Sequence, residues 1–449
     1  MTSIHATAAL LGAGWAENVR FVMEGARIRS IETATAPRPD DERHDVVVPG
    51  LANVHSHAFQ RAMAGLAETR GPANDSFWTW RKVMYDFTFA FDPEAVEAVA
   101  AQLYIEMLEA GFTRVGEFHY LHHDRDGRPY ADIAEHAVRI AAAAQTSGIG
   151  LTLLPVFYAH SNFGGATPSE GQKRFINTLD SFATLMERCE TIIAALPEGR
   201  LGLAPHSLRA VTPDELAQIL PLAKDGPIHI HVAEQTKEVD DCLAWSGARP
   251  MEWLLDNAPV DERWTLIHAT HMTETETSAM ARRKAVAGLC PITEANLGDG
   301  FFPATPFLNE GGAFGIGSDS NVQITLSGEL RQLEYAQRLL LRSRNVIAHP
   351  GESTGRRLFE EALAGGCRSL RGSGPLDIGA RADMVSLSMA GVPGWTVQTI
   401  LDHWIFGAGV GVDTVWVGGR KRVSNGRHLN RDRIFARFSE FMRSARSNP

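Results

Sequence analysis

His55 and His57 are the residues whose types and spacing point most directly to chemistry in this chain. They close the apolar run Val46–His57. Alternate side chains on a β-strand share a face, so histidines at positions i and i+2 converge on one point. Imidazole nitrogens held in this way are half of a transition-metal site. We therefore expect a metal centre at the end of this run, completed by residues from elsewhere in the chain.

Candidates for the other half of the metal site lie much later in the sequence. His231 lies in the run Ile228–Glu234, and Asp319 lies in the run Phe314–Ser320. Three imidazoles and one carboxylate suit one Zn²⁺ per chain, and Fe²⁺ is an alternative that the ligand types leave open. His229 shares a face with His231 but lies one layer deeper, so we assign the metal to His231 and leave His229 to the core.

Glu234 and His268 are the expected acid–base residues. Water bound to such a metal has its pKa lowered towards about 7 and can attack a trigonal carbon. Glu234, three residues beyond His231, is placed to take the water proton and deliver it to the leaving nitrogen. His268 closes another strand-like run and could stabilise the tetrahedral centre, with His271 as the competing histidine. Asp319 could bind the metal, orient the water or do both; its alternative role is to cap a following helix.

Eight apolar runs alternate with helix-like segments, which predicts an α/β protein with a (β/α)₈ TIM-type barrel. Continuous hydrophobicity within the runs is typical of parallel strands buried on both faces. The active site of such a barrel lies at the carboxyl ends of its strands, where the candidate residues fall. The runs are Val46–His57, Phe112–Phe118, Ile149–Tyr158, Arg200–Ser207, Ile228–Glu234, Trp264–Thr270, Ala285–Pro291 and Phe314–Ser320. The helix-like segments include Pro93–Ala110, Asp132–Gln145, Gln172–Cys189, Pro213–Ala223 and Thr273–Arg283.

The two ends of the chain differ from the middle. Short alternating runs before residue 46, and strand-like segments at Ala380–Ser388 and Val412–Val423, predict a small β-sandwich domain built from both termini. We therefore expect three parts. Residues 1–48 with 370–428 form the composite β-sandwich, residues 49–369 form the metal-dependent barrel, and residues 429–449 form a C-terminal helix with Asp432 as its N-cap.

The composition is that of a soluble globular protein. The 449 residues are 44% apolar and 21% charged, and the formal net charge is −10. A negative chain argues against nucleic acid or an anionic membrane as partner. The four cysteines are widely separated, and we find neither a signal peptide nor a run of about 20 apolar residues. We therefore expect a cytoplasmic protein that acts on a small molecule.

The residues above, in their order, resemble the amidohydrolase superfamily over essentially the whole chain. The pattern PG-x₄-HxH at Pro49–His57, HxxE at His231–Glu234 and Ser-Asp at Asp319 are similar to its mononuclear deaminase branch, which includes guanine, cytosine and adenosine deaminases. The resemblance implies four metal ligands and two proton-transfer residues. The ligands are His55, His57, His231 and Asp319; the proton-transfer residues are Glu234 and His268.

Longer segments resemble the N-formimino-L-glutamate deiminases (iminohydrolases) of bacterial histidine degradation. The segments are His55–Gly65, Phe77–Arg81, Glu117–Tyr120, Pro205–Arg209 and His231–Thr236. This resemblance implies a homodimer that hydrolyses the formimino group to N-formyl-L-glutamate and ammonia. It also implies five substrate-binding residues, which are Gln60, Arg81, Tyr120, His206 and Arg209.

The two arginines in that set suit a dicarboxylate substrate, because guanidinium groups bind carboxylates bidentately. We expect Arg209, just past the fourth run, to overhang the barrel mouth. We expect Arg81 to lie in a loop whose aromatic neighbours Phe77, Trp78 and Trp80 exclude water and strengthen an ion pair. The main alternative is a mononuclear zinc deaminase of a purine, pyrimidine or related ring. That alternative predicts a stacking pocket with amide groups in place of two arginines.

Overall fold

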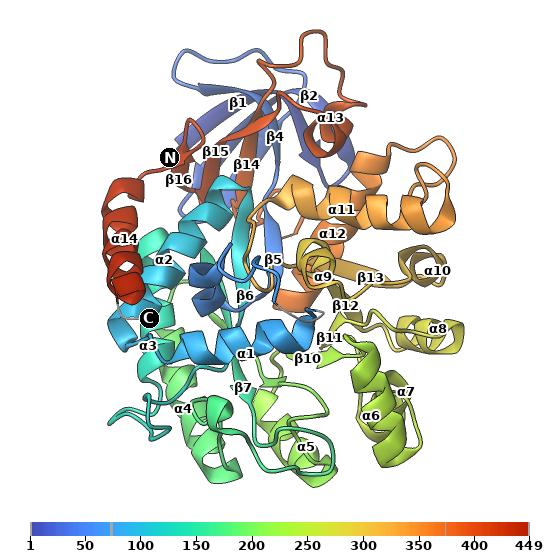
Figure 1. The fold of residues 1–449 in the computed structure, drawn as a ribbon. Helices are drawn as coiled ribbons and strands as arrows, with labels where there is room; N and C mark the ends of the chain where they lie inside the picture. The colour runs from blue at the N-terminus through green and yellow to red at the C-terminus, as the bar shows by residue number, and fades with distance from the viewer. Residues whose placement is uncertain (1, 72–74, 373, 448–449) are drawn as a thin grey trace.

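Parallel strands curl into a closed barrel in the computed structural model, which describes residues 2–71, 75–372 and 374–447 (Figure 1). The hydrogen-bonded order is β10-β11-β12-β13-β5-β6-β7-β8, with β9 also paired to β7. Parallel bridges from Leu203 to Ile228 and from Ser207 to His231 close the barrel between the fourth strand position and β10. The predicted (β/α)₈ barrel is therefore confirmed. Its strands are β5 (Leu51–Ser56), β6 (Phe112–His119), β7 (Gly150–Phe157), β8 (Arg200–Leu201) with β9 (Ala204–Pro205), β10 (Ile228–Val232), β11 (Trp264–His268), β12 (Val286–Leu289) and β13 (Ala313–Ile316).

Helices between the strands cover the outside of the barrel (Figure 1). The helix expected over Gln172–Cys189 begins later, at Leu179, because the Thr178 side chain caps it by accepting from Ser181 N. The other predicted segments match helices to within a few residues. The helices are α2 (Pro93–Glu109), α3 (Glu135–Ser147), α4 (Leu179–Ala194), α5 (Pro213–Ile219), α6 (Thr236–Ser246), α7 (Pro250–Asn257), α8 (Glu274–Arg282), α9 (Pro291–Leu297), α10 (Ala304–Asn309), α11 (Leu326–Leu341), α12 (Thr354–Leu370) and α13 (Ile400–Phe406). Among the described residues, none of the helices combines the length and apolar character needed to cross a membrane.

A second sheet joins the two ends of the chain, which confirms the predicted small β unit. It is one mixed sheet, in which β1 pairs parallel to β4 and the remaining pairs are antiparallel. One face packs around a core of its own, which includes Phe21, Met384 and Trp416. The domain boundaries given above remain our proposal. The strands, in sheet order, are β17 (Arg427–His428), β16 (Arg420–Ser424), β15 (Gly411–Val417), β14 (Met384–Ser388), β4 (Glu42–Pro49), β1 (Thr2–Leu11), β2 (Gly14–Glu24) and β3 (Arg27–Glu32).

The run Val46–His57, expected as one barrel strand, is two strands in different sheets. Its first part belongs to β4 in the terminal sheet, and its second part is β5 in the barrel. Gly50 joins them and donates its N–H to Asp383 O at 3.0 Å. A Cβ at this position would lie 2.2 Å from Thr113 Cγ2, so the close approach of the two sheets requires glycine. The strand that leads to His55 and His57 is therefore tethered directly to the terminal sheet.

Arg81 lies on helix α1 (Phe77–Thr88) and not in a loop, so the predicted loop is wrong. A capping box between Ser76 and Thr79 starts this helix, with Ser76 N donating to Thr79 Oγ1 at 2.9 Å. The sequence did not indicate this helix, because its aromatic residues lie on more than one helix face and give no clear 3.6-residue hydrophobic period. Helix α1 lies across the front of the barrel in Figure 1.

The predicted C-terminal helix is α14 (Arg431–Ser447), and residues 448–449 of the predicted range lie outside the described residues. It packs against α2, where Arg437 donates to Glu97 at 2.8 Å. Asp432 is not the N-cap: it lies in the first turn and pairs with Arg427. The Asp432 carboxylate is therefore bound to Arg427 and does not cap the helix.

Four histidines near β6 and α3 are buried away from the predicted metal ligands: His119, His122, His123 and His136. Burial lowers the pKa of His119 and of His136 to about 3. Their neutral forms are therefore favoured in the folded chain, whereas the unfolded chain takes up these protons near the ordinary pKa of 6.5. Their contribution to stability is complete above that pKa and is lost as pH falls from it towards about 3.

We expect His136→Asn to flatten the acid side of the stability profile. The Asn amide can replace the contact between His136 Nδ1 and Leu121 O, which is 2.7 Å long. Between about pH 7 and pH 5 the wild type should lose about 2 kcal/mol more unfolding free energy than the variant. Urea unfolding at each pH measures this difference, with the exposed His349 replaced by Asn as the control. Parallel profiles for the wild type and His136→Asn would contradict the argument.

Candidate metal centre and active site

The four side chains predicted to be metal ligands meet at the carboxyl ends of three barrel strands. Each is at most 5% exposed, and one donor atom from each lies within 4.8 Å of the others. Asp319 Oδ1 lies 3.1 Å from His57 Nε2 and 3.3 Å from His55 Nε2. His55 Nε2 lies 3.0 Å from His231 Nε2. The barrel therefore brings together a buried group that can hold a metal ion.

The ring contacts of this group fit a divalent cation. His57 Nδ1 lies 3.0 Å from Phe118 O, and His231 Nδ1 lies 2.9 Å from His206 O. Each Nδ1–H donates to its carbonyl, so each Nε2 directs a lone pair towards the shared centre. Burial lowers the pKa of His55 to about 3 and that of His231 well below its usual value, which favours neutral rings. Neutral nitrogens that face one another at 3.0 Å require a cation or a proton between them.

Three of the residues that turn into this site have a strained backbone conformation. Ala233, His268 and Asp319 have φ values of 53°, 67° and 44°, in the left-handed region that favours glycine. Each lies at or just beyond the carboxyl end of a barrel strand. The turn at Asp319 is held by its own N–H, which donates to His55 O at 3.0 Å. Strained conformations of this kind persist where the surrounding structure enforces them, commonly at active sites.

Glu234 lies beside the metal-ligating group, between an arginine and a histidine. Its Oε2 lies 3.8 Å from Arg209 Nη2, and its Oε1 lies 3.7 Å from His268 Nε2. The backbone N–H of Glu234 donates to Glu238 Oε2 at 3.1 Å, which fixes the turn that carries it. Burial raises the pKa of Glu234. A carboxylate with a raised pKa is suited to both accepting and returning a proton.

His268 is surrounded by carboxylates. Its Nδ1 lies 3.2 Å from Glu294 Oε1, and its Nε2 lies 3.9 Å from Asp319 Oδ2. Burial alone would lower the pKa of His268, but the negative charges of Glu234, Glu294 and Asp319 outweigh it and raise this pKa to about 10. The neighbouring carboxylates therefore favour the protonated form of the ring. Glu294 was not found from the sequence, because it lies on α9, far along the chain from its partner and outside any motif.

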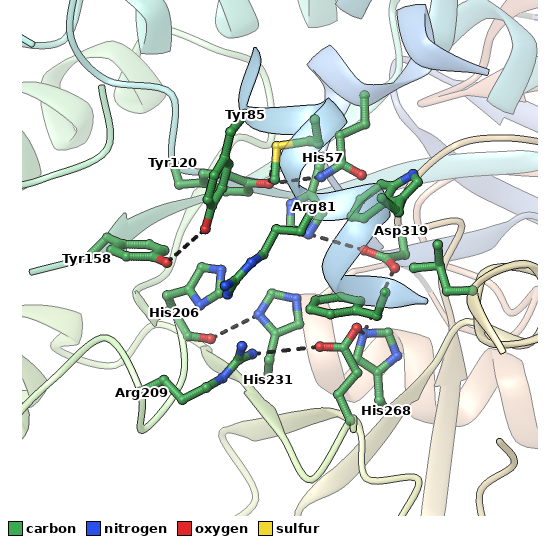
Figure 2. A pocket seen from close by; sticks show the side chains of 16 residues that line it. His57, Arg81, Tyr85, Tyr120, Tyr158, His206, Arg209, His231, His268 and Asp319 are labelled. Carbon is green, nitrogen blue, oxygen red and sulfur yellow. Dashed lines mark hydrogen bonds and ion pairs between the residues drawn. The ribbon is translucent and has the colours of Figure 1, made fainter. Parts of the chain in front are cut away.

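The five residues predicted to bind substrate line one cavity with the acid–base pair (Figure 2). The cavity is narrow, about 40 Å³. Gln60 donates to Tyr120 Oη at 2.8 Å, which leaves Gln60 Oε1 without a partner among the described residues. The guanidinium groups of Arg81 and Arg209 lie 4.5 Å and 5.8 Å from the ring of Trp78. The predicted residues in this cavity are His57, Gln60, Arg81, Tyr120, His206, Arg209, His231, Glu234, His268 and Asp319.

The sequence did not predict two tyrosines that line this cavity. Tyr85 and Tyr158 lie with their hydroxyl oxygens 3.5 Å apart, near Arg81 in Figure 2. Gln172 donates to the Tyr158 hydroxyl at 2.7 Å. Tyr158 ends the third apolar run, so the strand-end rule could have found it. Tyr85 follows Arg81 by four residues and shares its helix face, which becomes visible only once α1 is recognised as a helix.

A parallel barrel with a buried His₃Asp group at its rim, beside a buried glutamate and a further buried histidine, defines a metal-dependent hydrolase. The chain belongs to the amidohydrolase family, whose model matches residues 46–422. A model described as the N-terminal domain of formimidoylglutamate deiminase HutF matches residues 1–45. The family predicted from the sequence is confirmed.

Individual relatives agree with this placement. A formimidoylglutamate deiminase from Pseudomonas aeruginosa is 50% identical over 452 residues, which cover 98% of this chain and 99% of that protein. The crystal structure of an amidohydrolase from Brucella melitensis is 58% identical, covers 99% of this chain and 100% of that chain, and has a TM-score of 0.97. A 5-methylthioadenosine/S-adenosylhomocysteine deaminase from Natronomonas pharaonis is 28% identical and covers 80% of this chain and 76% of that protein.

Proposed function

We propose that this enzyme hydrolyses N-formimino-L-glutamate to N-formyl-L-glutamate and ammonia, with one Zn²⁺ per chain. The observation that carries the proposal is the pairing of Arg81 and Arg209 with the metal-ligating group in one cavity. Two guanidinium groups match the two carboxylates of the substrate. A relative 50% identical over its whole length, named formimidoylglutamate deiminase, supports the same substrate.

Zinc suits the site because its donors are three imidazoles and one carboxylate, although Fe²⁺ accepts the same set. A cation held by His55, His57, His231 and Asp319 would lower the pKa of water towards about 7. Glu234 accepts a proton from the attacking water as the water oxygen forms a bond to the formimino carbon. The same carboxylate then delivers this proton to the formimino nitrogen. It next moves the proton of the new hydroxyl group to that nitrogen as the C–N bond breaks, which yields the formyl carbonyl and ammonia; its position between Arg209 and His268 allows both transfers.

His268 stabilises the negative charge that develops beside it as water attacks the substrate. Its Nε2 faces both Glu234 and Asp319, so the imidazolium stabilises this charge at the reacting centre. Arg81 and Arg209 hold the substrate carboxylates, and Gln60, Tyr120 and His206 supply neutral contacts around its chain. Burial lowers the pKa of His206 well below its usual value, so its ring makes these contacts in the neutral form.

Glu294→Gln should lower kcat by about 10- to 100-fold with little change in KM. Glu294 does not line the cavity but holds His268 Nδ1 at 3.2 Å, so its loss removes the carboxylate that keeps the ring oriented and charged. Steady-state kinetics and the pH profile of kcat test this positioning role, and the basic limb should move to lower pH. Glu294→Asp should recover part of the activity. A variant with unchanged kcat and pH profile would contradict the role.

The direct test of the proposed function is ammonia release from N-formimino-L-glutamate by zinc-loaded protein, with the product identified by mass. We expect turnover in the ordinary enzyme range, about 1–10³ s⁻¹. Guanine, cytosine and adenosine serve as comparison substrates and should release ammonia at least about 10³-fold more slowly. Release from a ring substrate but not from formiminoglutamate would replace the proposal with the ring-deaminase alternative. Removal of the metal by a chelator should abolish turnover, and Zn²⁺ or Fe²⁺ should restore this turnover.

We also propose that the enzyme is a homodimer, as the resemblance implies, and that it acts in the cytoplasm, as the composition indicates. Light scattering after gel filtration measures the mass of the particle in solution. A mass close to the 49.0 kDa of one chain would refute the dimer.

A further inference from the structure

A second cavity lies between the barrel and the terminal sheet, and we call it the basal cavity. Its volume is about 390 Å³, within the range that small ligands occupy. The barrel wall includes residues 148–151 and 196–197, at the amino ends of β7 and β8. Catalytic groups in this barrel lie at the carboxyl ends of the strands, so the basal cavity opens on the opposite side.

Three arginines from the terminal sheet face the basal cavity: Arg381, Arg420 and Arg422. Arg381 Nε lies 3.0 Å from both carboxylate oxygens of Asp383, whose Oδ1 also accepts from Gly418 N at 2.6 Å. Arg381 Nη1 also lies 4.0 Å from Glu198 Oε1. Among the described residues, no carboxylate lies within 4.0 Å of the guanidinium nitrogens of Arg420 or Arg422. Two positive charges are therefore uncompensated in a chain whose formal net charge is −10.

The position of Arg422 is energetically unfavourable without a bound ligand. It is the extra residue of a β-bulge in the pairing of β15 with β16, a feature that redirects side chains. Its Nε is buried and has no hydrogen-bond partner among the described residues. Burial and the positive charges of Arg420 and Arg381 lower the pKa of Arg422. An anion in the basal cavity would satisfy the buried donor and offset the repulsion.

We propose that the basal cavity binds a small organic phosphate monoester. Phosphate concentrates two negative charges and several acceptor oxygens on one group, and guanidinium groups bind such oxygens bidentately. The remaining wall includes Ile149, Leu196 and Pro197, which offer apolar surface to the body of the ligand. A bare phosphate would leave this apolar wall uncovered, so the monoester fits better than the free ion.

Isothermal titration of the full-length, metal-loaded enzyme at low ionic strength tests the proposal. The probes are glycerol 3-phosphate, inorganic phosphate and succinate. We expect saturable binding of glycerol 3-phosphate, with the other two weaker by at least about tenfold. The double variant Arg420→Gln/Arg422→Gln should lose at least about tenfold in affinity. As a control, Arg282→Gln removes one positive charge at the exposed end of α8, as Arg420→Gln alone does in the basal cavity, and should bind as the wild type does. Neither variant should change kcat.

Three results would overturn the proposal. The first is an absence of saturable binding by glycerol 3-phosphate. The second is equal affinity in the double variant, which would place the ligand elsewhere, for example on the arginines of the catalytic cavity. The third is succinate that binds as tightly as glycerol 3-phosphate, which would make the ligand class wrong. If the double variant does not fold, the single variant Arg420→Gln replaces it, because Arg420 is exposed and its substitution should not disturb folding. The single variant should bind glycerol 3-phosphate at least about threefold more weakly than the wild type.

Discussion

Glu234→Gln should lower kcat by about 10³-fold or more while leaving the bound metal at the wild-type level. The amide keeps the shape of the side chain but cannot accept the proton of the attacking water. The carboxylate is not among the four ligating groups, so metal content should be unaffected. Steady-state kinetics and metal analysis of the purified variant measure the two quantities separately.

Glu274→Gln provides the matched control for this variant. Glu274 is exposed in the first turn of α8 and does not line the catalytic cavity, so the same chemical change there should leave kcat unaltered. If Glu234→Gln turned over near the wild-type rate, another group would have to transfer the proton. A variant that lost its metal would instead assign Glu234 to the coordination of the cation.

Arg209→Ala should lower kcat/KM for N-formimino-L-glutamate by about 10²- to 10³-fold. Arg209 is only 5% exposed, and its Nε has no partner among the described residues. It is therefore available for a substrate carboxylate in a cavity that excludes most water, where a charged hydrogen bond is strong. Part of the loss should appear in kcat, because Arg209 also lies 3.8 Å from Glu234.

A substrate analogue that lacks one carboxylate separates the two effects of Arg209. If this arginine binds the missing group, Arg209→Ala and the wild type should differ little on the analogue, as in a double-mutant cycle. Arg282→Ala controls for the loss of one positive charge from the protein. An unchanged kcat/KM for the full substrate would place Arg209 outside the binding site.

The sequence predicted the rim of the barrel well because the apolar pattern of a strand and the direction of its side chains depend on neighbouring residues. His55 and His57 share a face by the period of a strand, and Asp319 follows a strand whose small residues allow close approach. The structure therefore brings together the residues that lie at strand ends. Each predicted role in binding and catalysis remains a proposal, to be tested by the variants above.

Residues that reach the site from outside the strands were harder to predict. Arg81 was expected in a loop, and Tyr85 was missed, because α1 has aromatic residues on several faces and little helical periodicity. Glu294 touches His268 only through tertiary packing, so no local pattern in the sequence relates the two. Glu238 holds the turn at Glu234 in the same way. Contacts of this kind depend on the folded barrel and have no signature in one sequence.

The single glycine link between β4 and β5 has a practical consequence for anyone who alters the ends of this chain. β4 pairs on one side with β1, from the first residues, and on the other with β14, from the last quarter of the chain. Gly50 passes directly from β4 into the strand that ends at His55 and His57. We therefore expect a purification tag or a deletion that disturbs β1 to change the position of His55 and His57 through β4, and a lower metal content of the purified protein would reveal that change.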